Sequence, residues 1–188
     1  MANEYDKYYL TENLFGAPYP ELVAFYAAIE EKGKLLDMGC GQGRDAIALA
    51  RLGFAVLGVD SSRVGIAQLN EVARKEQLPL QGVVADMYEY DDFASFRFIL
   101  LDSIFHFGKK ERAKEIAFLQ RILEGATSGT WLTVCIQDTG HKLKTFQAIT
   151  SQYNNLELIH ETDLIYHYED QEFGHHSKTK YRMITLNI

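Results

Sequence analysis

The residues of clearest chemical meaning are glycines and acids that lie close together near the N-terminal third of the chain. Residues 35–37 read as an apolar strand, and the loop after them has glycine at every second position, at Gly39, Gly41 and Gly43. A second apolar strand, residues 55–59, ends in Asp60, 21 residues after the first glycine. Glycine lets the backbone approach a ligand, and a carboxylate so placed accepts hydrogen bonds from ribose hydroxyls. The pattern predicts a βαβ unit that binds an adenosine-containing cofactor.

The glycine loop also separates two classes of cofactor. Dinucleotide-binding loops usually read G-x-G-x-x-G/A, with a third small residue that lets helix and strand pack closely. Arg44 stands at that third position, and the chain has no G-x-x-x-x-G-K-[ST] pattern to cradle a diphosphate. Asp37, just before the loop, favours a cofactor that carries positive charge and no phosphate. S-adenosylmethionine fits, because it has a sulfonium and an α-ammonium group.

The run from Asp37 to Gly43 resembles the first motif of the class I S-adenosylmethionine-dependent methyltransferases, an acidic residue followed by G-x-G-x-G. Within that class, the compact chain and the stretch Gly39 to Arg44 are similar to tellurite-resistance and thiopurine-like methyltransferases. The resemblance implies that S-adenosylmethionine is the cofactor. It also implies an enzyme that transfers a methyl group.

The same resemblance assigns roles to individual residues. Asp60 is expected to bind the ribose, with Ser61 in the same cofactor-binding set, and Asp86 to bind the adenine amino group. Met87 is expected to lie against the adenine ring, and Asp102 near the ammonium. The methionine part of the cofactor is then bordered by Asp37 and by the backbone of Gly39, Cys40 and Gly41.

The order of apolar segments predicts how these residues come together. Strands are expected at 35–37, 55–59, 80–85, 96–101 and 130–136, and paired strands at 156–168 and 178–188; helices are expected at 21–31, after the glycine loop, and at 63–76, 109–123 and 143–151. This order predicts an α/β fold, a Rossmann-like doubly wound sheet of seven strands, mostly parallel, with a C-terminal antiparallel hairpin strand. Ligands bind such sheets at the carboxyl ends of the strands, where the four acids Asp37, Asp60, Asp86 and Asp102 are expected to converge.

Length and composition favour one domain spanning residues 1–188, with residues 1–33 as an N-terminal helical cap or lid. Tyr5, Tyr8 and Tyr9 either fold over the cofactor or pack at the edge of the sheet. The formal net charge of −7 argues against nucleic acid as the main partner. We find no apolar run long enough to cross a membrane and no signal segment, so we expect a cytoplasmic protein.

His106 is the best candidate for a catalytic group. Methyl transfer from a sulfonium is an in-line displacement, so the protein must mainly align the acceptor and exclude water. A general base is needed only where the acceptor is protonated at working pH. His106 follows Asp102 by four residues in a loop that should face the acceptor. The alternative is a partly exposed histidine packed between Phe105 and Phe107.

We expect no metal site. His167, His175 and His176 could rim the pocket, but their spacing matches no tight ligand set, and adjacent side chains on a strand point to opposite faces. Cys40 and Cys135 have no activating neighbour in sequence and are interpreted as small apolar fillers.

The leading hypothesis is an S-adenosylmethionine-dependent methyltransferase with a small-molecule acceptor, because little of the chain lies outside the cofactor fold. The N/D-P-P-Y stretch typical of methyltransferases that modify nucleic-acid bases is replaced by residues 102–105, Asp-Ser-Ile-Phe. Two alternatives stay open: a nicotinamide-dependent oxidoreductase, and a module that binds S-adenosylmethionine without catalysis. The sequence specifies neither the acceptor nor the oligomeric state.

Overall fold

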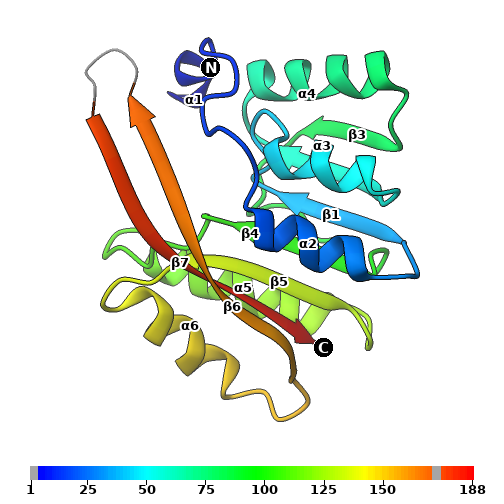
Figure 1. Ribbon diagram of the computed structural model, residues 1–188. Coiled ribbons are helices and arrows are strands. Elements are labelled where there is room, and N and C mark those ends of the chain that lie inside the picture. The colour runs from blue at the N-terminus through cyan, green and yellow to red at the C-terminus, as the bar shows by residue number, and fades with distance from the viewer. Residues whose placement is uncertain (1–3, 171–174) are drawn as a thin grey trace.

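The computed structural model describes residues 4–170 and 175–188, and only the backbone of residues 4–5, 167–170 and 175–177 (Figure 1). Its centre is a seven-stranded sheet in the order β3-β2-β1-β4-β5-β7-β6. The strands are β1 (Lys34–Met38), β2 (Ala55–Asp60), β3 (Leu80–Val84), β4 (Phe98–Asp102), β5 (Trp131–Gln137), β6 (Glu157–Asp170) and β7 (His175–Asn187). Strand β7 is antiparallel to both of its neighbours, and the other pairs are parallel. The predicted fold is confirmed.

The three central strands are apolar along nearly their whole length because helices cover both faces of the sheet. Strands β1, β4 and β5 are each buried at four or more consecutive positions. Leu36 pairs with Leu57 on one side and with Ile99 on the other, which fixes the register of the central strands. This register brings the carboxyl ends of β1, β2 and β4 to one edge.

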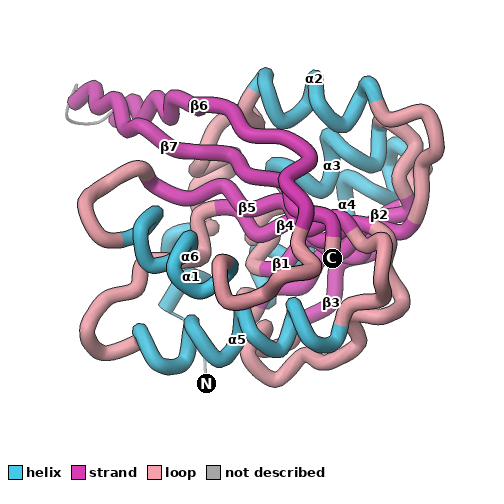
Figure 2. Tube along the Cα trace, turned by 90° about the horizontal axis from the view of Figure 1, so that it is seen from below, coloured by secondary structure: helices cyan, strands magenta, loops and turns pink. Residues whose placement is uncertain are grey.

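Two layers of helices complete the core (Figure 2). Helices α2 (Pro20–Ala28), α3 (Arg44–Arg51) and α4 (Arg63–Glu76) cover one face, where Tyr26, Leu49 and Leu69 are fully buried. Helices α5 (Arg112–Gly125) and α6 (Lys142–Thr150) cover the other face, around Phe118 and Phe146. Helix α2 is therefore part of a core layer, since its side chains pack directly against the sheet.

The ends of the helices follow local chemistry. Helix α4 spans the predicted residues 63–76, since the Ser62 hydroxyl accepts a hydrogen bond from Gly65 N at 3.1 Å and caps its first turn. Helix α2 ends at Ala28, three residues before the predicted end. The Lys32 ammonium donates to the carbonyls of Tyr26 and Ala27 there, and so satisfies carbonyls that further helix would have used. The short helix α1 (Glu4–Tyr8) lies in the segment expected to be a helical cap or lid, although no helix bounds were predicted there.

Strands β6 and β7 form a long hairpin that extends past the carboxyl edge of the sheet (Figure 1). Figure 2 shows that the far end of the hairpin lies well apart from α1. No helix among the described residues combines the length and the apolar character that crossing a membrane would require.

Candidate functional site

The glycine loop joins β1 to α3 through a tight turn. Gly41 and Gly43 have φ values of +53° and +87°, in the left-handed region that favours glycine. Gly43 N donates to the Cys40 carbonyl at 2.8 Å, and Gly43 is the residue that precedes α3. Gly39 N donates to the Val59 carbonyl at 2.7 Å, which ties the loop to the end of β2. The glycine loop and the end of β2 are thus joined by backbone hydrogen bonds.

Asp60 holds this junction together. Its Oδ2 accepts from Gly41 N at 2.9 Å, and its Oδ1 accepts from Ser62 N at 2.7 Å. Burial raises the pKa of this carboxyl, and the hydrogen bonds from Ser62 and Gly41 partly oppose that rise. Each carboxylate oxygen can accept more than one hydrogen bond, so the group can still take ribose hydroxyls from the cavity that it lines.

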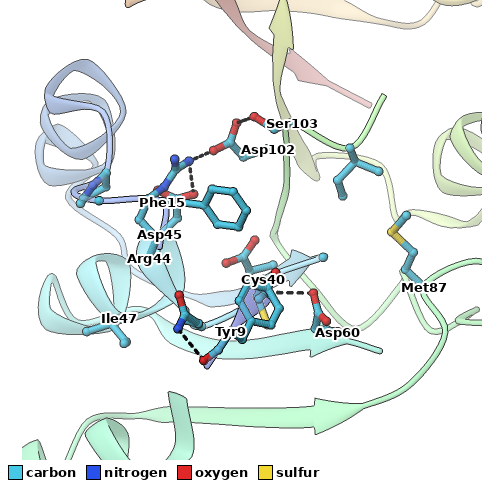
Figure 3. A pocket seen from close by; sticks show the side chains of 18 of the residues that line it. Tyr9, Phe15, Cys40, Arg44, Asp45, Ile47, Asp60, Met87, Asp102 and Ser103 are labelled. Carbon is cyan, nitrogen blue, oxygen red and sulfur yellow. Dashed lines mark hydrogen bonds and ion pairs between the residues drawn. The ribbon is translucent and has the colours of Figure 1, made fainter. Parts of the chain in front are cut away.

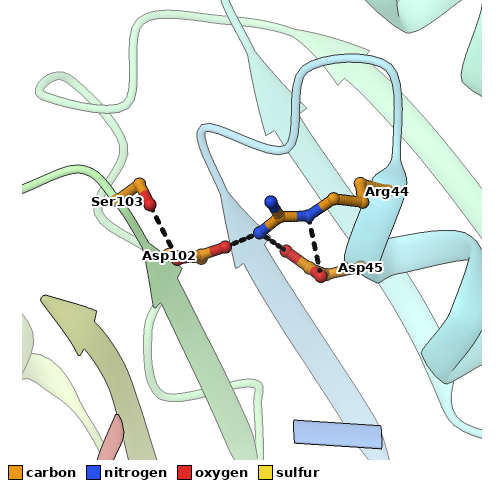
Figure 4. A network of polar contacts seen from close by, with 4 residues as sticks. All are labelled: Arg44, Asp45, Asp102 and Ser103. Carbon is orange, nitrogen blue, oxygen red and sulfur yellow. Dashed lines mark hydrogen bonds and ion pairs between the residues drawn. The ribbon is translucent and has the colours of Figure 1, made fainter. Parts of the chain in front are cut away.

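Three carboxylates, those of Asp37, Asp45 and Asp102, form what we call the acidic floor of the site. Figure 4 shows two of them, Asp45 and Asp102, around Arg44. Arg44, at the start of α3, forms ion pairs with Asp45 and, across the carboxyl edge of the sheet, with Asp102. The Asp102 carboxylate also accepts from the Ser103 hydroxyl at 2.9 Å. Asp102, which we expected near the cofactor ammonium, is therefore already paired with a guanidinium.

Asp37 is the carboxylate of this floor that lacks a full set of partners. It is 2% exposed, and its Oδ2 has no hydrogen-bond partner among the described atoms, although Ala46 N–H reaches the group. Burial, followed by the charge of Asp45, raises the pKa of Asp37 well above its ordinary value. A buried carboxylate of this kind is stabilised by a donor or a cation brought by a ligand.

The opposite side of the cavity is apolar. A Cβ placed on Gly39 would lie 3.2 Å from Ile104 Cδ1 and 3.8 Å from Met87 Sδ, so these two side chains border the glycine loop closely. Met87 lies across the cavity from Asp60 and Cys40 (Figure 3). Asp86, which lies two residues beyond β3, accepts from Tyr88 N at 2.9 Å. The predicted adenine contacts Asp86 and Met87 both line the same cavity as Asp60.

The loop after β4 has a strained backbone. Ser103 and Phe107 adopt φ values of +58° and +49°, which non-glycine residues rarely do. The buried Glu115 of α5 holds the loop by accepting hydrogen bonds from the backbone N–H groups of His106 and Phe107. Strain of this kind persists where surrounding structure enforces it, and it is common at functional sites.

His106 itself opens onto the cavity, while Phe105 and Phe107 are buried and stack on each other at 5.3 Å. The structural alternative, a partly exposed histidine between two packed aromatic residues, predicts the same arrangement, so the catalytic role of His106 stays a prediction. Partial burial of its ring, followed by the charge of Lys142, lowers the pKa of His106, and Glu115 opposes this. The ring therefore stays neutral to a lower pH than a free histidine would.

All these groups line one cavity of about 1100 Å³. The cavity also extends between side chains of α3 and α4. All the predicted cofactor residues and His106 line it: Asp37, Gly39, Cys40, Gly41, Asp60, Ser61, Asp86, Met87, Asp102 and His106. Sequence reasoning missed Phe15, Arg44, Tyr166 and Tyr181 as lining residues. Only Arg44 carried a signal, as a charged residue next to the glycine motif. The three aromatic residues come from distant segments.

The remaining predictions concern the two cysteines, Tyr5, the other histidines and a metal site. Cys40 and Cys135 are buried, and burial raises the pKa of both thiols, in keeping with apolar fillers. The side chains of Tyr5, His167, His175 and His176 lie outside the described residues. Among the side chains that the structure describes, no group of three or more histidine, cysteine or acidic residues could hold a metal ion.

Comparison with known proteins finds a matching family model and similar curated proteins. A family model described as tellurite resistance protein TehB matches residues 4–182. A probable S-adenosyl-L-methionine-dependent methyltransferase TehB from Haemophilus influenzae (strain 10810) is 36% identical over 83 residues. That match covers 44% of this chain and 29% of the relative, so the chain aligns with less than a third of the relative's length.

Solved structures share the fold. The crystal structure of TehB from Haemophilus influenzae superposes with a TM-score of 0.72 at 22% identity, covering 97% of this chain and 65% of that one. Magnesium protoporphyrin IX methyltransferase from Synechocystis PCC 6803, determined with bound S-adenosylmethionine, superposes with a TM-score of 0.66 at 16% identity, covering 87% and 76%. At these identities the likeness concerns the fold alone.

Proposed function

The chain belongs to the tellurite resistance protein TehB family, and we propose that it transfers the methyl group of S-adenosylmethionine to a small-molecule acceptor. The relative from Haemophilus influenzae that carries this activity in its name supports the cofactor. The observation that carries the proposal is the position of Asp60. Its carboxylate stands at the end of β2, held by Gly41 N and Ser62 N, and lines the cavity beside the glycine loop.

The charges of the site fit this cofactor. Three buried or half-buried acids, Asp37, Asp45 and Asp60, line the cavity near the guanidinium of Arg44, which is paired with Asp45 and Asp102. A ligand with positive charge offsets the desolvation of these carboxylates, whereas a dinucleotide diphosphate adds two negative charges to them. We therefore favour Asp37, with its unpartnered Oδ2, over the paired Asp102 as the acceptor for the cofactor ammonium.

The other predicted residues, which follow the ends of the strands, would each contact one part of the cofactor. Asp60 and Ser61 would hold the ribose, Asp86 the adenine amino group, and Met87 the adenine ring. When bound, S-adenosylmethionine supplies an electrophilic methyl group that needs no further activation. The backbone of Gly39, Cys40 and Gly41 would border its methionine part, because glycine lets the backbone approach a ligand closely.

On the acceptor side, the chain itself would do two things. The strained loop at residues 103–107 and the aromatic rings of Phe15, Tyr166 and Tyr181 would orient the acceptor and exclude water. His106 would take the proton of an acceptor that is protonated at working pH, since its lowered pKa keeps Nδ1 or Nε2 free to accept. An acceptor that is already ionised would need the alignment alone.

A small molecule is the favoured acceptor because the described chain adds little to the cofactor fold beyond the N-terminal segment and the hairpin. Residues 4–16 would serve as the lid, since Tyr9 and Phe15 line the cavity, whereas α2 is bound into the core. Arg44 in place of a third small residue disfavours a nicotinamide-dependent oxidoreductase. A binding module without catalysis remains the second candidate, because the same cavity would serve it.

The test is turnover with methyl-labelled S-adenosylmethionine and a panel of small metabolites that includes thiols, amines, carboxylates and chalcogen oxyanions. Labelled product from at least one small acceptor, and none from RNA, DNA or protein, is the expected result. Binding of S-adenosylmethionine with no label transferred to any panel member would favour the binding module. Label in a macromolecule would overturn the small-molecule acceptor.

A further inference from the structure

Residues 6–15, which we call the strap, lie across the glycine loop. Tyr9 is 4% exposed, and a Cβ placed on Gly41 would lie 2.5 Å from the Tyr9 hydroxyl oxygen. The Tyr9 ring meets the Phe15 ring edge to face, with centroids 6.1 Å apart, and both rings line the cavity (Figure 3). The strap thus forms a wall of the site in which we place the cofactor.

The side chain of Gln42 is the main polar link between the strap and the glycine loop. Its Oε1 accepts from Leu14 N at 3.0 Å. Its Nε2 donates to the Thr11 carbonyl at 2.8 Å and makes a longer contact of 3.4 Å with the Tyr9 carbonyl. One side chain in the middle of the cofactor motif therefore binds the strap at three backbone positions.

A second set of contacts joins the strap to the start of α4. Gln68 Nε2 donates to the Tyr9 carbonyl at 2.9 Å, and Gln68 Oε1 accepts from Gln42 Nε2 at 2.7 Å. Asp6 accepts from the Ser62 hydroxyl, and Ser62 N in turn donates to Asp60. The strap is therefore bonded to the same residues that hold the predicted ribose carboxylate.

Polar contacts, more than apolar packing, hold the strap in place. Tyr8 and Leu10 are 55% and 76% exposed, and Tyr9 is the strap residue with a buried apolar side chain. A segment with little buried apolar surface opens locally at low free energy, and such segments commonly gate ligand sites. The hydrogen bonds of Gln42, together with those of Gln68 and Asp6, then oppose opening of the strap.

We propose that Gln42 is a positioning residue that latches the strap over the cofactor, so that release of the cofactor requires the Gln42 bonds to break. This inference rests on the proposed function, since it takes the ligand beneath the strap to be S-adenosylmethionine. The strap would also complete the site by placing the Tyr9 ring against Gly41.

The test compares dissociation rates of S-adenosylhomocysteine from the full chain by stopped-flow displacement. Gln42→Glu keeps the shape of the side chain but turns its donor into an acceptor that faces the Tyr9 carbonyl, the Thr11 carbonyl and Gln68 Oε1. Gln42→Met removes the polar bonds without adding charge. Both variants should release the ligand about 10-fold faster or more, the effect of losing a net hydrogen bond or two.

Two further readouts separate the latch from a general loss of structure. Gln147→Glu places the same charge on an exposed position of α6 and should release the ligand at the wild-type rate. The melting temperature of the ligand-free Gln42 variants should stay within a few degrees of wild type, and bound ligand should no longer protect the strap from chymotrypsin at Tyr8 and Leu10.

The outcomes distinguish this inference from the proposed function. If the wild-type chain does not bind S-adenosylhomocysteine, the proposed function fails first. If it binds and both Gln42 variants release it at the wild-type rate, the latch is overturned. Faster release from Gln42→Glu alone would assign the effect to charge and would equally overturn the latch.

Discussion

The two halves of the cavity are built in different ways. Most of the cofactor half, residues 37–62, is one contiguous stretch in which backbone N–H groups and strand-end carboxylates bind one another, as Gly41 N binds Asp60, and Asp86 and Met87 complete this half. The acceptor half combines the loop 103–107, Glu115 of α5, and Tyr166 and Tyr181 of the hairpin. Its members are far apart in sequence and are brought together only by the completed fold.

This difference has a consequence for function. Backbone groups fixed by positive φ and by short-range hydrogen bonds specify one ligand shape, so the cofactor half should tolerate few changes. The acceptor half consists largely of side chains on loops and on a projecting hairpin, which can be replaced without disturbing the sheet. A family can therefore keep one cofactor while its acceptors change, and mutations in the two halves should separate binding from turnover.

The largest expected effect lies in the acceptor half. His106→Ala should lower turnover of a protonated acceptor about 10²–10⁴-fold, the range for general acid–base catalysis, while the Kd for S-adenosylhomocysteine stays nearly unchanged. Steady-state kinetics and calorimetry on the same preparation measure both quantities. Full activity of the variant would mean that the acceptor half only orients the acceptor and that His106 is not a general base.

In the cofactor half, Asp60→Ala should weaken S-adenosylhomocysteine binding by about 1.5–3 kcal/mol, roughly 10–150-fold in Kd, because a charged acceptor of hydrogen bonds is lost. Turnover at saturating cofactor should change little. Asp91→Ala removes an exposed acid outside the cavity and serves as the matched control. Equal Kd values for wild type and Asp60→Ala, measured by calorimetry, would exclude Asp60 from the site.

The acidic floor should couple cofactor binding to pH. Burial and the charge of Asp45 raise the pKa of Asp37 in the free protein, so this carboxyl is partly protonated above the ordinary carboxyl range. A bound ammonium favours the ionised form and expels that proton. Affinity for S-adenosylmethionine should therefore strengthen as pH rises, by at most about tenfold per pH unit for one proton, until the pKa of the free carboxyl is passed.

Calorimetry in buffers of different ionisation enthalpy measures the protons released. Asp37→Asn should release fewer protons than wild type and should show a flatter dependence of affinity on pH. Identical proton release from both proteins would mean that Asp37 is not the group that faces the ammonium.

The smallest effect concerns the pH profile of the acceptor half. Burial and then Lys142 lower the pKa of His106 below its ordinary 6.5, so turnover should fall only when pH drops through this lowered value. Lys142→Gln removes one of the two causes, so the pKa should rise part of the way back and the acid limb should move to higher pH. If turnover falls at the same pH in wild type and Lys142→Gln, the titrating group is not His106.

The cofactor half was predictable from sequence because its function follows from local patterns. Glycine at 39, 41 and 43 and an acid at 60 fix a turn and a hydrogen bond without help from distant segments. The sheet was predictable for a similar reason, since apolar strands and amphipathic helices alternate. The end of α2 was missed because it depends on the Lys32 side chain.

The acceptor half was predicted only at His106, since Asp102 was predicted as a cofactor contact. The positive φ of Ser103 and Phe107 has no signal in residue type, because neither is glycine, and it is enforced by Glu115 from another helix. The pairing of Arg44 with Asp102 crosses from α3 to β4 and needs the strand order to be known. The position of Tyr9 against Gly41 likewise depends on contacts with α4.

The central claim is that the glycine loop and Asp60 bind S-adenosylmethionine, and thermal unfolding with S-adenosylhomocysteine and with NAD tests it most directly. At a ligand concentration of about 100 times Kd, binding to the native state should add about 2.7 kcal/mol, or roughly 5–10 °C in Tm for a chain of this size. We predict this rise for S-adenosylhomocysteine, about half of it or less in Asp60→Ala at the same ligand concentration, and no rise with NAD. A rise with NAD and none with S-adenosylhomocysteine would contradict the account.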